Sequence, residues 1–182
     1  MLIFHKNNNL QRANNKLYTI EEIHNLFNIW KDKYWNLVYE NPHKLQKIVE
    51  YFDGFPCKVY SQRYELFLTN TKCVNCGLEA NCYILEKQDT AKAWHFNLYR
   101  VDGNNTMLFT KDHILPRSKG GKNWLQNYQT MRYNCNQEKA DQLEISTGVY
   151  VPDSKKDPHA KRDISHLIDP SGEHNVEYML SF

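Results

Sequence analysis

The residues best suited to catalysis lie between positions 111 and 139 of the 182-residue chain. Asp112 and His113 are adjacent, and two asparagines, Asn127 and Asn136, follow them. A carboxylate and a carboxamide can hold a hard divalent cation through oxygen, and a neighbouring imidazole can accept a proton from water near neutral pH. Basic side chains nearby would suit a polyanionic substrate. These residue types are the ones that hydrolysis of a phosphodiester with one metal ion requires.

The spacing of these residues resembles the motif of the HNH endonucleases, which belong to the ββα-metal nuclease superfamily. That motif contains an Asp-His pair, a proline near the start of a loop, a Gly-Gly pair, an asparagine, and a Cys-Asn pair with a lysine three residues later. In this chain the matching residues are Asp112, His113, Pro116, Gly120, Gly121, Asn127, Cys135, Asn136 and Lys139. Because the last letter of the motif is Asn136, the chain resembles the HNN-type variant. The resemblance extends from Cys73 to Asp141.

The resemblance implies a mechanism and gives a role to each of four residues. His113 would be the general base that activates water, and Asp112 with Asn136 would hold one Mg²⁺ (or Mn²⁺) that stabilises the leaving group. Asn127 would support the loop that orients the histidine. The implied substrate is DNA, although the sequence alone would also allow RNA. A DNA-binding module that keeps the fold without the chemistry is the alternative. A phage-encoded or homing-type enzyme is the biological context that the family suggests.

Positive charge is concentrated around this motif, although the whole chain has a net charge of only +2. Six lysines and arginines stand against three acidic residues between positions 111 and 143. Any nucleic-acid-binding surface must therefore be local. The predicted phosphate contacts are Arg117, Lys119, Lys122 and Lys139. For Lys139, a solvated position on a helix is an equally good interpretation.

The five cysteines form an odd set, and Cys73 and Cys76 make a Cys-x-x-Cys pair. An odd number favours metal binding and free thiols over a disulfide framework. Many HNH proteins add a second such pair, and its last member would be Cys135, but Arg132 occupies the position of the other cysteine. A structural zinc normally takes four ligands, so Cys82 or a histidine would have to complete the set of Cys73, Cys76 and Cys135. Loss of the zinc, with apolar packing in its place, is the alternative.

The resemblance and the local propensities together predict an α+β protein with a ββα-metal nuclease core, made of a β-hairpin, a loop and a helix. The core would occupy residues 71–146, including the Cys-x-x-Cys pair. An N-terminal helical region would occupy 1–70, where it could dock DNA or act as a scaffold beside the core. An extended C-terminal tail, rich in charge and proline, would occupy 147–182.

Local patterns predict two helices in the N-terminal region. Thr19 and Glu22 form a capping-box pattern before a helix over 20–32. Apolar residues at helical spacing predict a second helix from Asn41-Pro42 through Phe52, ended by Asp53-Gly54.

The predicted core begins with a hairpin of strands 94–101 and 107–114, separated by the turn sequence Asp102-Gly103-Asn104-Asn105. The second strand would deliver Asp112 and His113. A loop over 116–123 and a helix over 133–143 would follow.

No stretch of the sequence approaches the length of a membrane span, and the N-terminal apolar run is too short for a signal peptide. We therefore expect a cytoplasmic protein, located in the host cytoplasm if it is phage encoded, with DNA as its partner and no membrane contact. Oligomeric state and target sequence stay open.

Overall fold

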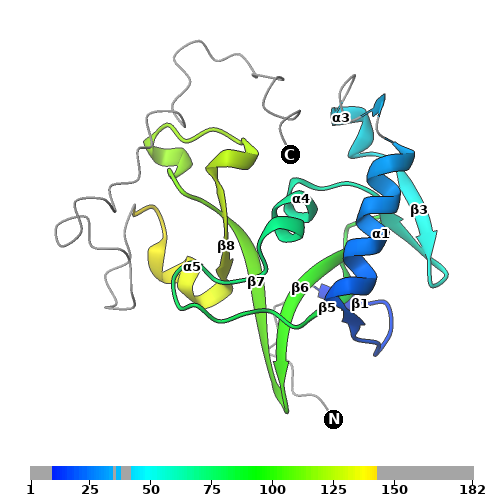
Figure 1. The fold of residues 1–182 in the computed structure, drawn as a ribbon, viewed down its shortest axis with the longest axis horizontal. Helices are drawn as coiled ribbons and strands as arrows, with labels where there is room; N and C mark the ends of the chain where they lie inside the picture. Colours follow the sequence, from blue (N-terminus) through cyan, green and yellow to red (C-terminus); the bar gives the residue numbers. More distant parts are fainter. Residues whose placement is uncertain (1–9, 35, 38–41, 143–182) are drawn as a thin grey trace.

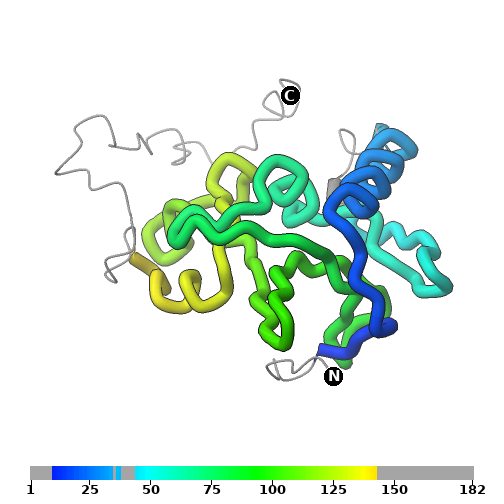
Figure 2. Tube along the Cα trace, turned by 60° about the horizontal axis from the view of Figure 1, so that its bottom comes forward, coloured from blue at the N-terminus to red at the C-terminus, as the bar shows by residue number. Residues whose placement is uncertain are grey.

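The computed structural model describes residues 10–34, 36–37 and 42–142. They form an α+β fold, as predicted, with helices on both sides of an antiparallel sheet (Figures 1 and 2). The helices are α1 (Ile20–Lys33), α3 (Pro42–Leu45), α4 (Gln62–Thr69) and α5 (Tyr133–Lys139). The strands are β1 (Leu10–Arg12), β2 (Tyr18–Thr19), β3 (Val49–Phe52), β4 (Phe55–Lys58), β5 (Cys82–Gln88), β6 (His95–Asp102), β7 (Asn105–His113) and β8 (Tyr128–Arg132). The predicted tail at 147–182 lies outside the described residues.

The main sheet has the strand order β1-β5-β6-β7-β8, and β2 also pairs with β5. All of its pairs are antiparallel. The predicted hairpin is confirmed as β6 and β7, whose register Asp102↔Asn105 leaves a two-residue turn. Since β1 and β2 come from the first 20 residues, the region predicted to be helical also supplies strands to the sheet that carries the core.

An aromatic core joins the N-terminal helices to this sheet. Phe27 of α1 stacks on Tyr64 of α4 with ring centroids 4.0 Å apart, and its ring also meets Phe96 of β6 at 5.8 Å. The predicted helix over 20–32 is confirmed as α1. Its predicted cap is also present, since Oγ1 of Thr19 accepts a hydrogen bond from the backbone N–H of Glu22 at 3.1 Å. Burial of these large rings fixes α1 and α4 against one face of the sheet.

The second predicted helix is wrong beyond Leu45. Residues 49–52 form β3, which pairs with β4 in a separate two-stranded sheet. The turn between them is Asp53-Gly54, and both residues have positive φ, 50° and 82°. Asp-Gly is a preferred pair for a two-residue hairpin turn, because such a turn needs positive φ at both positions. The local turn sequence therefore prevailed over the helical spacing of the apolar residues.

The predicted sequence of strand, loop and helix omitted one strand. After the loop that follows His113, the chain returns as β8 and pairs with β7 in the register His113↔Tyr128. Four of the five β8 residues are buried, so β8 lacks the polar alternation that marks a strand with one solvated face. The final helix is confirmed, but it ends at Lys139, where Ala140 takes a positive φ of 47°.

None of the helices in the described ranges is long and apolar enough to cross a lipid bilayer.

Candidate active site

The β7–β8 hairpin lies between α4 and α5, and the two faces of β7 meet different helices (Figure 1). Side chains alternate across a strand. Thr110 and Asp112 contact side chains of α5, whereas Lys111 contacts Gln62 at the start of α4. His113 shares the face of Lys111 and is the last residue of β7. The side chains of His113, the predicted base, and Asp112, a predicted metal ligand, therefore point to opposite faces of β7 at the same end of the strand.

Asp112 is buried, with 6% of its surface exposed. Its Oδ2 accepts a hydrogen bond from Nε2 of Gln129 at 2.7 Å and lies 3.0 Å from Nζ of Lys139. Lys139 is itself only 2% exposed, and Nζ also donates to the backbone oxygen of His113 at 2.7 Å. The ammonium of Lys139 therefore points into the protein. This position does not fit the predicted phosphate contact, nor a solvated lysine.

Asn136 lies three residues before Lys139 and so on the same side of α5. Its Nδ2 donates to Oγ1 of Thr110 at 2.9 Å. Within the described residues, no hydrogen bond reaches Oδ1 of Asn136 or Oδ1 of Asp112, and neither atom is enclosed by protein. In this described part of the chain, two hard oxygen donors from neighbouring elements have no hydrogen-bond partner, which fits a divalent cation with oxygen ligands.

His113 is half-buried at the end of β7 and contacts the side chains of Asn123 and Tyr128. Its Nε2 lies 2.9 Å from Oδ1 of Asn123. Its ring meets the ring of Tyr128 edge to face, with centroids 4.9 Å apart at 70°. Because a carboxamide oxygen can only accept, Nε2 must carry the proton in this contact. Nδ1 then has the free lone pair.

Asn127 is completely buried and ties together the loop that follows His113. Its Oδ1 accepts from the N–H of Leu115 at 2.8 Å, and Nδ2 donates to the backbone oxygens of Leu115 at 3.0 Å and Lys122 at 2.9 Å. Gly121 packs into this clamp, because a Cβ there would lie 1.8 Å from the Leu115 oxygen. The supporting role predicted for Asn127 agrees with these contacts.

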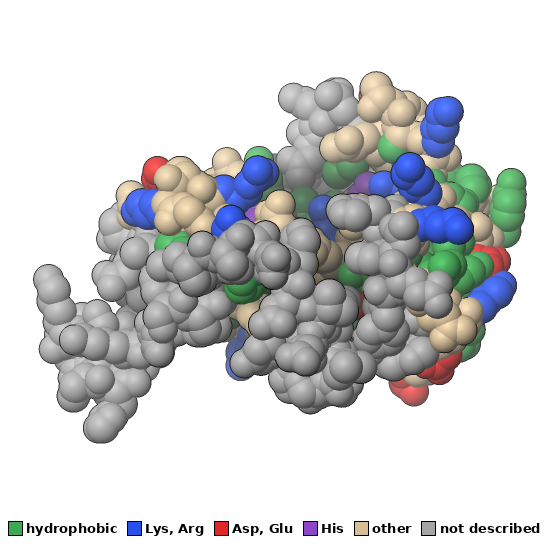
Figure 3. Space-filling model, turned by 90° about the horizontal axis from the view of Figure 1, so that it is seen from above, with side chains coloured by type: hydrophobic (Ala, Val, Ile, Leu, Met, Phe, Trp, Pro, Cys, Tyr) green, Lys and Arg blue, Asp and Glu red, His purple; other side chains and the backbone are tan. Residues whose placement is uncertain are grey.

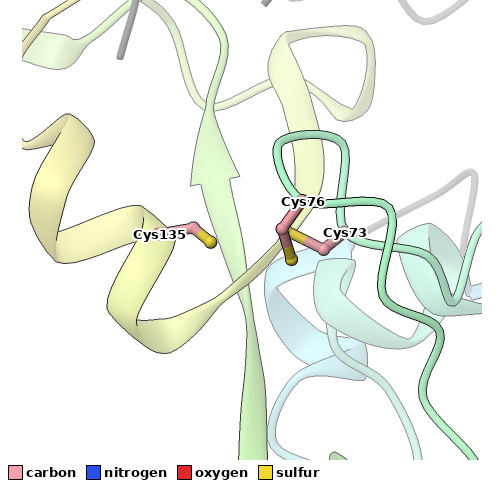
Figure 4. Close-up of side chains that lie close together, drawn as sticks. All are labelled: Cys73, Cys76 and Cys135. Atoms are coloured by element: carbon pink, nitrogen blue, oxygen red, sulfur yellow. The ribbon is translucent and has the colours of Figure 1, made fainter. Parts of the chain in front are cut away.

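Cys73, Cys76 and Cys135 form a thiol cluster beside this site (Figure 4). Their Sγ atoms all lie within 4.8 Å of one another. Cys73 and Cys76 come from the turn between α4 and β5, and Cys135 points toward them from α5. Cys82 is not part of the cluster, since its thiol faces the Tyr99 backbone oxygen at 3.8 Å. No fourth cysteine, histidine or acidic residue joins the group within residues 10–142 that are described.

Arg132 stands beside the thiol cluster in place of a fourth cysteine. Burial alone would raise the pKa of Cys73, but backbone N–H donors, first that of Arg132 at 3.2 Å, hold this pKa below its ordinary value. Burial and the neighbouring Cys73 raise the pKa of Cys76 to about 11. Nε of Arg132 is buried without a partner. Although burial alone would lower it, the pKa of Arg132 is raised, because the adjacent cysteines, Cys135 first, stabilise its charge.

The family model described as HNH endonuclease matches residues 102–147, which contain β7, β8, α5 and the loop between the two strands. Over these residues the chain is similar to the HNH endonuclease family. Searches of curated proteins and of solved structures found no match. The HNH domain supports nuclease activity in general, and it contains Asp112, His113, Asn127 and Asn136.

The remaining basic residues of the HNH domain differ in exposure. Arg117, Lys119 and Lys122 are all exposed on the loop between β7 and β8, and Lys and Arg side chains are frequent on the face seen in Figure 3. Lys111 is instead half-buried, with Nζ 3.6 Å from the centroid of the Tyr128 ring. Burial, followed by the nearby Arg63, lowers the pKa of Lys111 to about 8.

Sequence reasoning missed three residues that hold the HNH site. Gln129 binds Asp112, Asn123 binds His113, and Gln62 binds the Asn123 backbone oxygen at 3.0 Å. Recognition of β8 as the partner of β7 would have placed Gln129 opposite Asp112. No sequence pattern could have identified Gln62, because the residues that it contacts are far from it in the sequence.

The loop clamp predicts that Asn127→Ala destabilises the protein by about 2–4 kcal/mol, because it leaves buried backbone groups of the loop without partners. Urea unfolding would measure the change. Asn127→Asp should destabilise the protein at least as much, because it places a second acceptor oxygen against the two backbone oxygens in a buried site. Asn134→Ala on the exposed side of α5 is the matched control. Equal stability of the Asn127→Ala and Asn134→Ala variants would contradict the clamp.

Proposed function

We propose that the protein is a metal-dependent endonuclease of the HNN type that hydrolyses phosphodiester bonds of DNA. The observation that carries the proposal is the arrangement at the end of β7. Asp112 and His113 leave this strand end, Asn136 stands on the adjoining helix, and Lys139 holds the strand and the helix together. A phosphate at the strand end would lie within reach of both sides of β7.

His113 is the proposed general base. Its Nε2 faces the carboxamide oxygen of Asn123 at 2.9 Å and so holds a proton. The lone pair on Nδ1 is therefore the one that can take a proton from the attacking water. Tyr128, whose ring lies edge-on to the imidazole, restricts its rotation. Fixed orientation of this kind favours proton transfer in the correct direction.

Asp112 and Asn136 are the proposed ligands of one Mg²⁺ or Mn²⁺. Their Oδ1 atoms are hard donors of the type these ions prefer. When bound, the ion would supply charge stabilisation for the leaving oxygen. Lys139 and Gln129 orient the Asp112 carboxylate through Oδ2, so that Oδ1 keeps one direction.

Exposed basic side chains near this site support a polyanionic substrate. Arg117, Lys119 and Lys122 all belong to the loop between β7 and β8, which begins directly after His113. Their positive charge would attract phosphate groups without reading the bases. The match to the HNH endonuclease family supports DNA as the proposed substrate.

A DNA-binding module without catalysis is the second candidate, and the buried ion pair favours it. The Lys139 ammonium already neutralises the Asp112 carboxylate at 3.0 Å, and this pairing reduces the attraction of Asp112 for a divalent ion. Cleavage assays distinguish the two candidates, because the binding module would bind DNA and leave it intact.

We also propose that the thiol cluster binds one structural zinc. Three thiolates around Zn²⁺ carry a net charge of −1, and the adjacent, half-buried Arg132 would neutralise it. The fourth position on the zinc would then be taken by a ligand other than cysteine. Such a site would connect α5 to the turn that carries Cys73 and Cys76.

The catalytic proposal predicts that His113→Ala lowers the cleavage rate of supercoiled plasmid in Mg²⁺ by at least about 100-fold, since the general base is lost. DNA affinity should stay near that of the wild type.

Asp112→Asn keeps the shape of the side chain and should raise the Mg²⁺ or Mn²⁺ concentration needed for activity, as should Asn136→Ala. His24→Ala, on α1 against Tyr83, is the control. Wild-type cleavage by His113→Ala would refute the assignment, and wild-type protein that binds but never cuts would favour the binding module.

The phosphate contacts predict that Arg117→Ala and Lys119→Ala weaken DNA binding similarly for all sequences. Each should reduce the slope of log affinity against log salt by about one unit, because each removes one phosphate contact. Fluorescence anisotropy at several salt concentrations would measure the slopes. Lys44→Ala, on the exposed end of α3, is a charge-matched control. A loss confined to one target sequence would mean that these side chains read bases.

The zinc proposal predicts about one zinc per chain by elemental analysis. Cys135→Ser should lower the zinc content and the unfolding temperature together, because folding and metal binding are coupled. Arg132→Cys should strengthen zinc binding in competition with a chelator, since it restores a fourth thiolate. Metal-free protein with unchanged stability and three titratable thiols would contradict the proposal.

A further inference from the structure

Gln62, the first residue of α4, lies outside the matched segment 102–147 and contacts three parts of the HNH domain. Its Oε1 accepts hydrogen bonds from the hydroxyl of Tyr128 at 3.1 Å and from Nζ of Lys111 at 3.4 Å. Its Nε2 donates to the backbone oxygen of Asn123 at 3.0 Å. Both ends of one carboxamide are therefore engaged by β7, β8 and the loop between them.

These contacts lead directly to His113. Asn123 binds Nε2 of the imidazole through its side chain, while Gln62 holds the Asn123 backbone. Tyr128 lies edge-on to the imidazole, while Gln62 holds the Tyr128 hydroxyl. Each side-chain neighbour of His113 described above is thus tied to the same glutamine.

Gln62 is itself held by a rigid part of the N-terminal region. Ser61 caps α4 through a hydrogen bond from the N–H of Arg63 at 3.3 Å. Tyr64, two residues after Gln62, is buried, and its hydroxyl accepts from the N–H of Phe96 at 3.1 Å. Phe67 on the next turn is fully buried. A group that positions a catalytic side chain works best when its own support is packed in this way.

We propose that Gln62 is a positioning residue of the nuclease site, acting on His113 through Asn123 and Tyr128. The proposal rests on His113 being the general base. It means that the N-terminal region supplies part of the catalytic apparatus, so the matched HNH segment does not contain the complete site. A purely structural role would instead make Gln62 a tie between α4 and the loop, without effect on the imidazole.

Two substitutions separate the contacts of Gln62. Gln62→Ala removes all of them, whereas Gln62→Glu keeps the oxygen acceptor for Tyr128 and Lys111 and loses only the donor to Asn123. Both variants should lower kcat about 10- to 100-fold with little change in KM. A catalytic group displaced by about 1 Å can lose about 100-fold in rate. Gln46→Ala, an exposed glutamine of the same region, should cleave like the wild type. Wild-type kcat in Gln62→Glu would overturn the proposal.

A double-mutant cycle tests whether Gln62 acts through Asn123. The combined rate loss of the Gln62→Ala/Asn123→Ala variant should be clearly smaller than the product of the two single losses, because residues that share a path are not additive, and the loss that remains from Gln62→Ala is the part that acts through Tyr128. Additive losses would overturn the proposed path. Urea unfolding of each variant shows whether a lower kcat reflects a smaller folded fraction.

Ring ¹⁵N chemical shifts of His113 provide a readout that does not depend on cleavage, with His113→Gln used to assign the signals. The wild type should show the Nε2–H form, and both Gln62 variants should show a mixture of tautomers. Unchanged shifts together with lower stability would reduce Gln62 to a structural tie. If the wild-type protein does not cleave DNA, the proposed function fails, while the shifts still decide whether Gln62 positions the imidazole.

Discussion

The buried ammonium of Lys139 is the interaction on which the rest of the site depends. It binds the carboxylate of Asp112 and the backbone oxygen of His113, and so fixes α5 to the end of β7. Loss of one partner from a buried ion pair typically costs about 3–5 kcal/mol, because the other charge is left without compensation. A helix of seven residues, such as α5, has little stability of its own. Its position relative to β7, and therefore that of Asn136, comes from such tertiary contacts.

A second group of contacts holds the other end of α5. Cys135 lies near the beginning of the helix and meets Cys73 and Cys76 from the turn before β5. Arg132 joins this group and brings positive charge to a cluster of thiols. The helix is thus fixed by an ion pair near its end, and near its start its thiol lies against two other thiols.

The imidazole of His113 is held from a different direction than the carboxylate of Asp112. The loop after His113 is clamped by Asn127, and Gly121 is required there because any larger residue would collide with the Leu115 backbone. On the far side, the start of α4 supports the same loop through Gln62. The side chains of His113 and Asp112 are therefore held by different neighbours, while Lys139 links the two residues through the His113 backbone oxygen.

The ordered residues from Asp112 to Asn136 were enough to predict the resemblance to the HNH family, and local patterns predicted the hairpin before the site, because both depend on spacing within a short segment. The helix α1 was equally local, with its own capping residue. Burial of Lys139, the pairing of β8 with β7, and the contacts of Gln62 were decided only by the tertiary structure. A lysine three residues after an asparagine can face solvent or protein, and its sequence neighbours are the same in both cases. What decides between them is whether a distant chain segment brings a carboxylate to it.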